Sequence, residues 1–303
     1  MAERSGPRRP RSSGQWRLLR AGGTGARLAG VVVQCNFQCT LKCILRRQVV
    51  SLTQAQIDQF NEQGFLPYED LLTPLEVKAL HQRLEDIGNE RVDFPDENVQ
   101  IEPRVERGEA QADPVRFNNV RKIWNLTKHD PVFMELARHP KILGVVRSLI
   151  GPDLKIYVDQ TLCKPPRVGS AKPPHQDSAY WTSIDPPNLV ICWIALNDAT
   201  ENNGCMRFIS GSHKAGVIEH KHLEDFRVED ARVGYEREVA VPLKAGSCSF
   251  HHSLALHRTD ANTSDDRRIG LTVAYMDARS KYIGNGAMPE YDLVSGRAYD
   301  GCV

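Results

Sequence analysis

The second half of the chain contains short runs rich in β-branched and aromatic residues, and this pattern limits the possible folds more than any other. Gly, Pro, Asn and Asp separate the runs, as is typical of short β-strands. They cover residues 154–163, 188–196, 205–209, 238–243, 247–251 and 269–276. No helical pattern lies between them, so the spacing predicts an antiparallel sandwich or barrel rather than a βαβ array.

Helical patterns come before these strands. Ser51 is a capping residue for a short helix that stops at Gly64. Thr73, followed by a Pro and by Glu76, forms a capping box for a second helix ending at Gly88. Two more helices are expected, and an irregular surface loop lies before them; the ranges are 130–136 and 140–150 for the helices and 91–118 for the loop. The sequence therefore predicts an α+β chain with a mainly β core, on which the N-terminal helices pack.

The first 50 residues differ in charge from the rest of the chain. They carry nine Arg and one Lys against one acid, a charge of +9, which leaves −8 on the other 253 residues. The segment lacks an apolar face, so we expect a disordered basic leader. A transit peptide and a mis-assigned start near Val49 or Val50 are both consistent with it. Residues 51–303 are expected to form a single domain.

The composition of residues 51–303 excludes several classes of protein. An acidic body argues against nucleic acid as its main partner, and no run of about 18 apolar residues could span a membrane. Five of the eight cysteines are scattered over the second half of the chain, several within apolar runs, which favours buried thiols in a reducing compartment. The cytoplasm is therefore expected, with organelle import through residues 1–50 left open. The sequence does not indicate the oligomeric state.

One cysteine cluster and one histidine cluster were considered as metal sites. Cys35, Cys39 and Cys43 lack a fourth nearby ligand for zinc and the spacing of an iron–sulfur motif. His175 and Asp177, at i and i+2 on an extended segment, point the same way and can bind one ion. His257 follows near the end of a later strand and supplies a third ligand. Two His and one carboxylate form the facial triad of non-haem Fe(II).

Three motifs together resemble the phytanoyl-CoA dioxygenase family of Fe(II)/2-oxoglutarate oxygenases. They are His175-Gln176-Asp177, the run from Asn203 to Lys214, and His257 followed by Arg268, and they occur in the family's order over roughly residues 51–280. The resemblance implies a double-stranded β-helix, which is a jelly-roll or cupin-like barrel. It also implies that His175, Asp177 and His257 bind the iron.

The resemblance assigns further residues to the co-substrate. Arg268 matches the residue for the distal carboxylate of 2-oxoglutarate, to which a planar guanidinium is suited. Thr259 matches the hydroxyl that helps to hold this carboxylate. Trp193, Gln160 and Lys122 match positions in the same pocket, although Trp193 could equally be a core aromatic residue. Substrate contacts are expected from three residues, Tyr180, Trp181 and Arg207; for Arg207 a salt-bridged role is the alternative.

The chemistry implied by the family is the oxidation of a C–H bond with O₂, coupled to the conversion of 2-oxoglutarate to succinate and CO₂, with ascorbate as a supporting reductant. Retention of Asp177 favours hydroxylation over halogenation. The substrate is expected to be a small molecule, such as an acyl-CoA, a free acid or a secondary metabolite. A metal-binding barrel with a regulatory role is the alternative. A zinc hydrolase is disfavoured because no general-base Glu adjoins the ligands.

Overall fold

The strands of the second half build two antiparallel sheets. The structure, a computed structural model, describes residues 50–223 and 225–303. Residues 1–49 lie outside the described residues. They include the basic leader, its three clustered cysteines and Val49, one of the two candidate start positions. All described residues belong to one compact unit.

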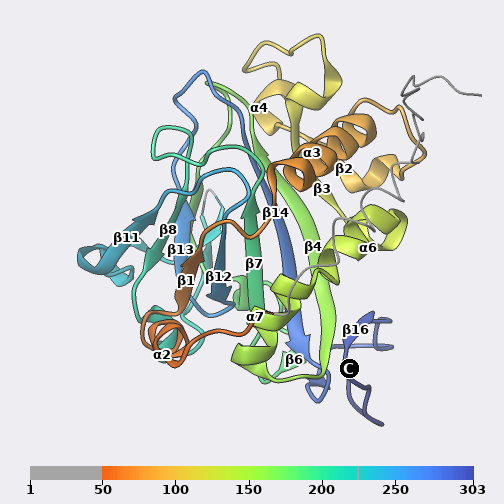
Figure 1. Cartoon of the computed structure of the whole chain (residues 1–303). Coiled ribbons are helices and arrows are strands. Elements are labelled where there is room, and N and C mark those ends of the chain that lie inside the picture. The colour runs from red at the N-terminus through yellow and green to blue at the C-terminus, as the bar shows by residue number, and fades with distance from the viewer. Residues whose placement is uncertain (1–49, 224) are drawn as a thin grey trace, which may run out of the picture. The chain divides into compact units, whose positions relative to one another are not determined.

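The larger sheet has eight strands, and β14 and β7 lie at its centre (Figure 1). Its path runs through β1 (Phe65–Tyr68), β12 (Cys248–His252), β7 (Val190–Ala195), β14 (Arg268–Asp277), β4 (Leu154–Lys164), β3 (Val120–Trp124) and β2 (Val99–Ile101), and β16 (Leu293–Ser295) pairs with β4. Each paired neighbour is antiparallel. Almost every residue of β7 and β14 is buried, because both faces of these central strands are covered.

The smaller sheet has four strands and carries two of the predicted metal ligands. Its order is β11 (Glu238–Val241), β8 (Met206–Ile209), β13 (His257–Thr259) and β5 (Lys172–His175). Two further two-stranded pairs are β9 (Lys221–His222) with β10 (Phe226–Arg227), and β6 (Ile184–Asp185) with β15 (Lys281–Tyr282). Trp193 of the larger sheet and Phe208 of the smaller sheet belong to one buried apolar cluster, so the two sheets face each other.

The helices of the described residues are α2 (Gln54–Gln63), α3 (Pro74–Gly88), α4 (Pro103–Glu106), α5 (Leu126–His129), α6 (Pro131–Ala137) and α7 (Pro140–Ile150). Most of them pack on the outer face of the larger sheet (Figure 1), whereas α4 has no buried residue. Leu84 of α3 and Val146 of α7 share one apolar core with Leu271 and Val273 of β14. Because side chains alternate along a strand, the residues between them, such as Thr272, point to the other face of the sheet.

The helix predictions agree closely with the structure, with one correction at an end. Thr73 caps α3 through the expected capping box with Glu76, and α7 has the expected bounds. The first helix is capped by Thr53 and not by Ser51, because Gln56 completes a capping box three residues after Thr53.

The stretch 91–118 is less irregular than predicted. Val99–Ile101 forms β2 and pairs with β3, and Pro103–Glu106 forms the short helix α4. The sequence did not indicate these elements because charged residues surround them and three or four residues are too few to show a periodic pattern. Within residues 50–223 and 225–303, no helix combines the length and the apolar character needed to cross a membrane.

Candidate metal centre and active site

The side chains of His175, Asp177 and His257 lie close together beside strands β5 and β13 of the smaller sheet. His175 ends β5 and His257 begins β13, and the two are direct partners in the register of this strand pair. Asp177 begins a single 3-10 turn just after β5. Its Oδ1 lies 3.7 Å from His175 Nε2 and 3.9 Å from His257 Nε2. One ligand atom from each residue lies within 4.8 Å of the others, a spacing that fits a shared metal ion.

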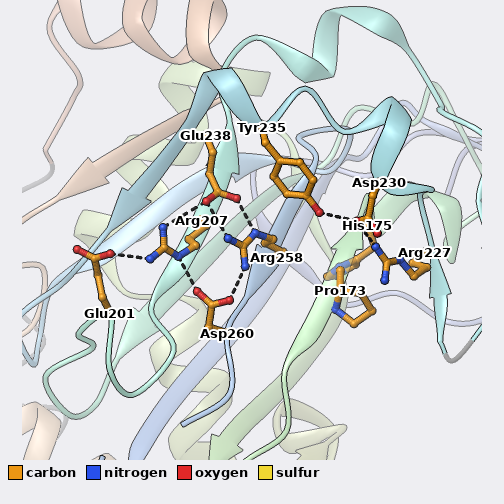
Figure 2. Close-up of polar contacts among 10 residues, drawn as sticks. All are labelled: Pro173, His175, Glu201, Arg207, Arg227, Asp230, Tyr235, Glu238, Arg258 and Asp260. Atoms are coloured by element: carbon orange, nitrogen blue, oxygen red, sulfur yellow. Dashed lines mark hydrogen bonds and ion pairs between the residues drawn. The ribbon is translucent and has the colours of Figure 1, made fainter. Parts of the chain in front are cut away.

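Backbone carbonyls orient both imidazoles. His175 Nδ1 lies 2.8 Å from the Pro173 carbonyl, as Figure 2 shows, and His257 Nδ1 lies 2.9 Å from the Ala255 carbonyl. A carbonyl oxygen only accepts, so each Nδ1 carries the ring proton. Each Nε2 then presents its lone pair toward Asp177, which is the usual arrangement for a metal-binding histidine.

The protonation states of the triad also suit a divalent metal. Burial lowers the pKa of His175 well below its ordinary value, and burial also lowers the pKa of His257. Burial by itself would raise the pKa of Asp177, but the neighbouring imidazoles, His257 foremost, bring this pKa below its usual range. At neutral pH the site therefore offers two unprotonated nitrogens and one carboxylate, the donor set of non-haem iron.

A cavity of about 390 Å³ opens beside the triad, between the two sheets. Ten of the eleven predicted site residues line it: His175, Asp177, His257, Arg268, Thr259, Trp193, Gln160, Lys122, Tyr180 and Trp181. The fold thus brings together positions that are up to 146 residues apart in the chain, Lys122 and Arg268.

The floor of the cavity is a row of polar residues across three strands of the larger sheet. Gln160 on β4 pairs with Thr272 on β14, and Thr272 pairs with Trp193 on β7. Trp193 Nε1 and Thr272 Oγ1 are buried and have no hydrogen-bond partner. Gly270 allows the indole to lie over β14, because a Cβ at this position would come within 2.2 Å of the Trp193 ring. Buried donors without partners indicate that the cavity takes a polar ligand.

Arg268 is a buried cation without an acidic partner. It is 2% exposed, and its guanidinium donates to the Gly204 and Leu162 carbonyls and lies 5.2 Å from the Trp193 ring. Burial lowers the pKa of Arg268 to about 10, so the group stays charged at neutral pH. Among the described residues no carboxylate contacts it, so a bound anion is the partner that the site lacks.

Lys122 and Thr259 lie at the sides of this cavity. Lys122 Nζ lies 5.4 Å from the Trp124 ring, and burial, followed by Lys172 and Arg121, lowers the pKa of Lys122. Thr259 is buried and pairs with Lys172 across β13 and β5, one irregular step beyond the pair formed by the two ligand histidines.

Tyr180 and Trp181 lie at the open side of the cavity. The Tyr180 hydroxyl accepts a hydrogen bond from Lys172 Nζ at 2.9 Å and donates to the Phe226 carbonyl at 2.8 Å. Trp181 packs against Tyr157 with ring centroids 5.2 Å apart. Tyr180 is 43% exposed, so this side of the cavity is accessible from solvent.

Arg207 does not line the cavity, contrary to the expectation of a substrate contact. Its guanidinium forms ion pairs with Glu201 at 2.6 Å, Asp260 at 2.8 Å and Glu238 at 3.2 Å, and Arg258 bridges the last two acids (Figure 2). Met206 lines the cavity, so strand alternation directs Arg207 to the outer face of the smaller sheet. The salt-bridged alternative describes this residue correctly.

Sequence reasoning did not assign three cavity residues that the structure brings to the site. His251 Nε2 lies 3.5 Å from Asp177 Oδ2, and neither ring nitrogen of His251 has a hydrogen-bond partner. Lys164 and Lys172 line the same cavity. Nothing in the local sequence distinguished the two lysines from surface lysines.

Comparison with known proteins identifies the family. The family profile described as "Phytanoyl-CoA dioxygenase (PhyH)" matches residues 60–270. The chain is 29% identical over 265 residues to "Phytanoyl-CoA dioxygenase domain-containing protein 1" of Mus musculus, which covers 75% of this chain and 91% of the relative. It is 28% identical over 240 residues to "L-proline trans-4-hydroxylase" of Streptomyces griseoviridis, with 72% and 84% covered.

Solved structures agree with this result. The non-haem α-ketoglutarate-dependent carbocyclase SnoK from nogalamycin biosynthesis matches with a TM-score of 0.61 and 26% identity, over 80% of this chain and 97% of that protein. The predicted double-stranded β-helix, the enzyme class and the cofactors Fe(II) and 2-oxoglutarate are confirmed. The chain belongs to the phytanoyl-CoA dioxygenase family of Fe(II)/2-oxoglutarate-dependent oxygenases.

Proposed function

We propose that residues 51–303 form a single oxygenase domain that hydroxylates an aliphatic C–H bond of a small molecule. The observation that carries this proposal is the placement of a complete His-Asp-His triad and an acid-free Arg268 in one cavity. A metal triad alone would suit several chemistries. A buried guanidinium facing the same space adds a place for the distal carboxylate of 2-oxoglutarate.

In this proposal His175, Asp177 and His257 hold Fe(II) on one face and leave the other face to ligands. Bound there, Fe(II) would supply the oxidising chemistry for a substrate C–H bond, with O₂ as oxidant and with 2-oxoglutarate converted to succinate and CO₂. The carbonyls of Pro173 and Ala255 fix the orientation of the two imidazoles. The ligand geometry is therefore set before the metal binds.

The remaining cavity residues position 2-oxoglutarate and the substrate. Arg268 and the Thr259 hydroxyl bind the distal carboxylate, and Trp193 and Gln160 shape the floor on which the co-substrate lies. Lys122 neutralises negative charge near Asp177. The Asp177 carboxylate in turn acts to raise the pKa of Lys122. Tyr180 and Trp181 at the open side contact the substrate. Arg207 is not included, because its three ion pairs lie outside the cavity.

The names of the relatives bear on the substrate class. One relative is named a proline hydroxylase and others are named phytanoyl-CoA dioxygenases. Both kinds of substrate are small and carry an oxidisable aliphatic C–H bond. We therefore retain acyl-CoAs, free acids and secondary metabolites as candidates, with hydroxylation as the reaction.

The test is succinate release from 2-oxoglutarate by the purified full chain, with Fe(II) and ascorbate and with O₂ either present or removed. The proposal expects succinate formation that requires Fe(II) and O₂, stimulation by the correct substrate, and a product heavier by one oxygen atom. The variant Asp177→Ala should abolish this activity and Arg268→Leu should reduce it strongly at low 2-oxoglutarate, whereas Lys244→Met, at an exposed lysine outside the cavity, should leave it unchanged. Metal binding without turnover for any member of a broad metabolite panel would instead support a regulatory metal-binding barrel.

A further inference from the structure

A second buried basic residue lies beside Arg268. Lys164 on β4 and Arg268 on β14 are direct partners in the strand register, and they are only 5% and 2% exposed. Both line the cavity that contains the metal triad. A charged Lys164 would be repelled by Arg268 in this buried site, so the charged form of Lys164 needs an anion to be favourable.

The side chain of Lys164 is held in place along its length. Gly204 and Gly169 flank its stem, and a Cβ at either glycine would come within 3 Å of Lys164 atoms. The Gly204 carbonyl accepts the hydrogen bond from Arg268 Nε, so the two cationic side chains share this wall. Lys164 Nζ donates to the Ser170 carbonyl, which uses one donor and leaves the rest of the amine available.

The acids near Lys164 are bound to other residues. Glu102 pairs with Arg121 at 3.4 Å and accepts a hydrogen bond from the Ser170 hydroxyl. Asp260 pairs with Arg207 and Arg258. The charged and titratable groups around Lys164 are Arg268 on β14, Arg121 and Lys122 on β3, Glu102 before α4, Asp260 after β13, and Cys163 on its own strand. Among the described residues none of the acids forms an ion pair with Lys164.

We infer that Lys164 is a second binding residue for the distal carboxylate of 2-oxoglutarate, and that binding of this dianion places a proton from solvent on the Lys164 amine. The inference rests on the proposed function, because it requires 2-oxoglutarate to occupy the Arg268 end of the cavity. Arg268 then supplies the fixed charge of this subsite, and Lys164 supplies a charge that is present only when the anion is bound.

The proton balance gives the inference a measurable sign. Burial, and then the charges of Arg268 and Arg121, lower the pKa of Lys164 to about 6, so the amine of the free protein is mostly neutral at pH 7.5. A carboxylate in contact favours the charged form and raises this pKa. The contribution of Lys164 to affinity is therefore complete below about pH 6 and is lost as pH rises through the higher pKa of the complex. A lysine that only packs between two glycines would show no such linkage.

The experiment is calorimetric titration of 2-oxoglutarate into the full chain, loaded with Fe(II) without O₂, in two buffers of different ionisation enthalpy. We expect the wild-type protein to take up about one proton per 2-oxoglutarate at pH 7.5. Its Kd should rise by up to about tenfold for each pH unit above pH 7. No redox turnover is needed for either readout.

Two variants and one control separate binding from packing. Lys164→Met should weaken binding by roughly 10- to 100-fold at pH 6.5, abolish the proton uptake and make Kd independent of pH. Lys164→Arg, whose charge is permanent, should bind 2-oxoglutarate without proton uptake and with a flat pH profile. Lys244→Met removes an 85%-exposed lysine and should behave as the wild type. Thermal unfolding of each variant reports whether it is folded.

The outcomes distinguish this inference from the proposed function. Tight binding of 2-oxoglutarate by the wild type without proton uptake overturns the role of Lys164 and leaves the oxygenase proposal intact. The same holds if Lys164→Met is folded and still takes up the proton. Failure of the metal-loaded wild type to bind 2-oxoglutarate overturns both. If Lys164→Met does not fold, the wild-type proton count and the Lys164→Arg profile decide.

Discussion

His175 and His257 are direct partners across β5 and β13, and their ring centroids lie 4.2 Å apart. Antiparallel pairing of two short strands therefore places two metal ligands side by side, although 82 positions separate them in the chain. The single turn after β5 adds Asp177. The metal centre depends on the register of this one strand pair.

Removing one ligand should abolish metal binding. His257→Ala leaves a buried Asp177 and one imidazole, so we expect Fe(II) affinity to fall by at least roughly 100-fold, with loss of succinate release. His222→Ala, a histidine outside the cavity on β9, is the matched control. Metal content after anaerobic loading and dialysis measures the effect. Full iron occupancy in the His257 variant would contradict the assignment of this ligand.

Arg268 should contribute to 2-oxoglutarate binding, and its neighbour Arg267 to the stability of the fold. Arg268→Leu should raise the KM for 2-oxoglutarate by roughly 30-fold or more, because losing a buried charge-assisted contact costs about 2–5 kcal/mol. Arg267 instead donates to the Phe117 and Val120 carbonyls on the other face of the strand. Arg267→Leu should lower the melting temperature with little change in KM. Steady-state kinetics and thermal unfolding of both variants provide the comparison, and a larger KM effect at Arg267 would reverse the assignment.

Gly270 should be necessary for the position of Trp193. In Gly270→Ala the new Cβ would meet the indole at 2.2 Å, so either the ring or β14 must move. We expect a loss of about 1–3 kcal/mol in the free energy of unfolding and weaker 2-oxoglutarate binding. Trp193→Leu in the same chain removes the clash, so the double variant should be more stable than the sum of the single effects predicts. If the effects of the two substitutions on the free energy of unfolding in urea are strictly additive, the contact between position 270 and Trp193 does not contribute.

Stability should fall in acid partly through Glu76. Burial alone would raise the pKa of Glu76, but hydrogen bonds from His139 and Thr73 lower it to about 2. A lowered folded-state pKa stabilises the fold above about pH 4.5, and this contribution, roughly 3 kcal/mol, is lost as pH falls toward 2. Glu76→Gln keeps the capping-box acceptor but not the charge.

Urea unfolding at several pH values tests this prediction. The variant should be less stable than the wild type at pH 7, and the difference should shrink progressively between pH 5 and pH 2. A difference that stays constant with pH would mean that the Glu76 charge does not contribute.

Residues 1–49 should be dispensable for catalysis. Every cavity residue lies between positions 100 and 272, and the helix that packs first on the core, α2, begins at Gln54. We expect a chain that starts at Val50 to release succinate at the full-length rate, because the described residues from position 100 onward already supply the triad and the cavity around it. Parallel assays of the two proteins test this. A folded but inactive truncated protein would show that the leader contributes to function.

Much of the fold and the His175–Asp177 pair could be predicted from local sequence because these signals are local, whereas His257 lies 82 positions from His175 and only the strand pairing brings it there. The capping box of Thr73 and Glu76, the apolar run at 190–195 and the i, i+2 spacing of His175 and Asp177 each arise within a few residues. The short strand β2 gave no such signal, since three residues among charged neighbours are too few to show an alternating pattern. The wrong cap at Ser51 reflects two neighbouring residues that could both cap, where Gln56 decided in favour of Thr53.

By itself the sequence predicted the strand-rich core and the three metal ligands from strand patterns and residue types, and the resemblance to the family added the co-substrate role of Arg268. Only the tertiary structure decided which cations face the cavity. Arg207 and Lys164 are both basic residues on β-strands, yet Arg207 meets three acids on the outer face and Lys164 lies buried opposite Arg268. The environment of a charged side chain is set by segments that are distant in the sequence and pack against it. These contacts exist only once the two sheets face each other in the folded protein.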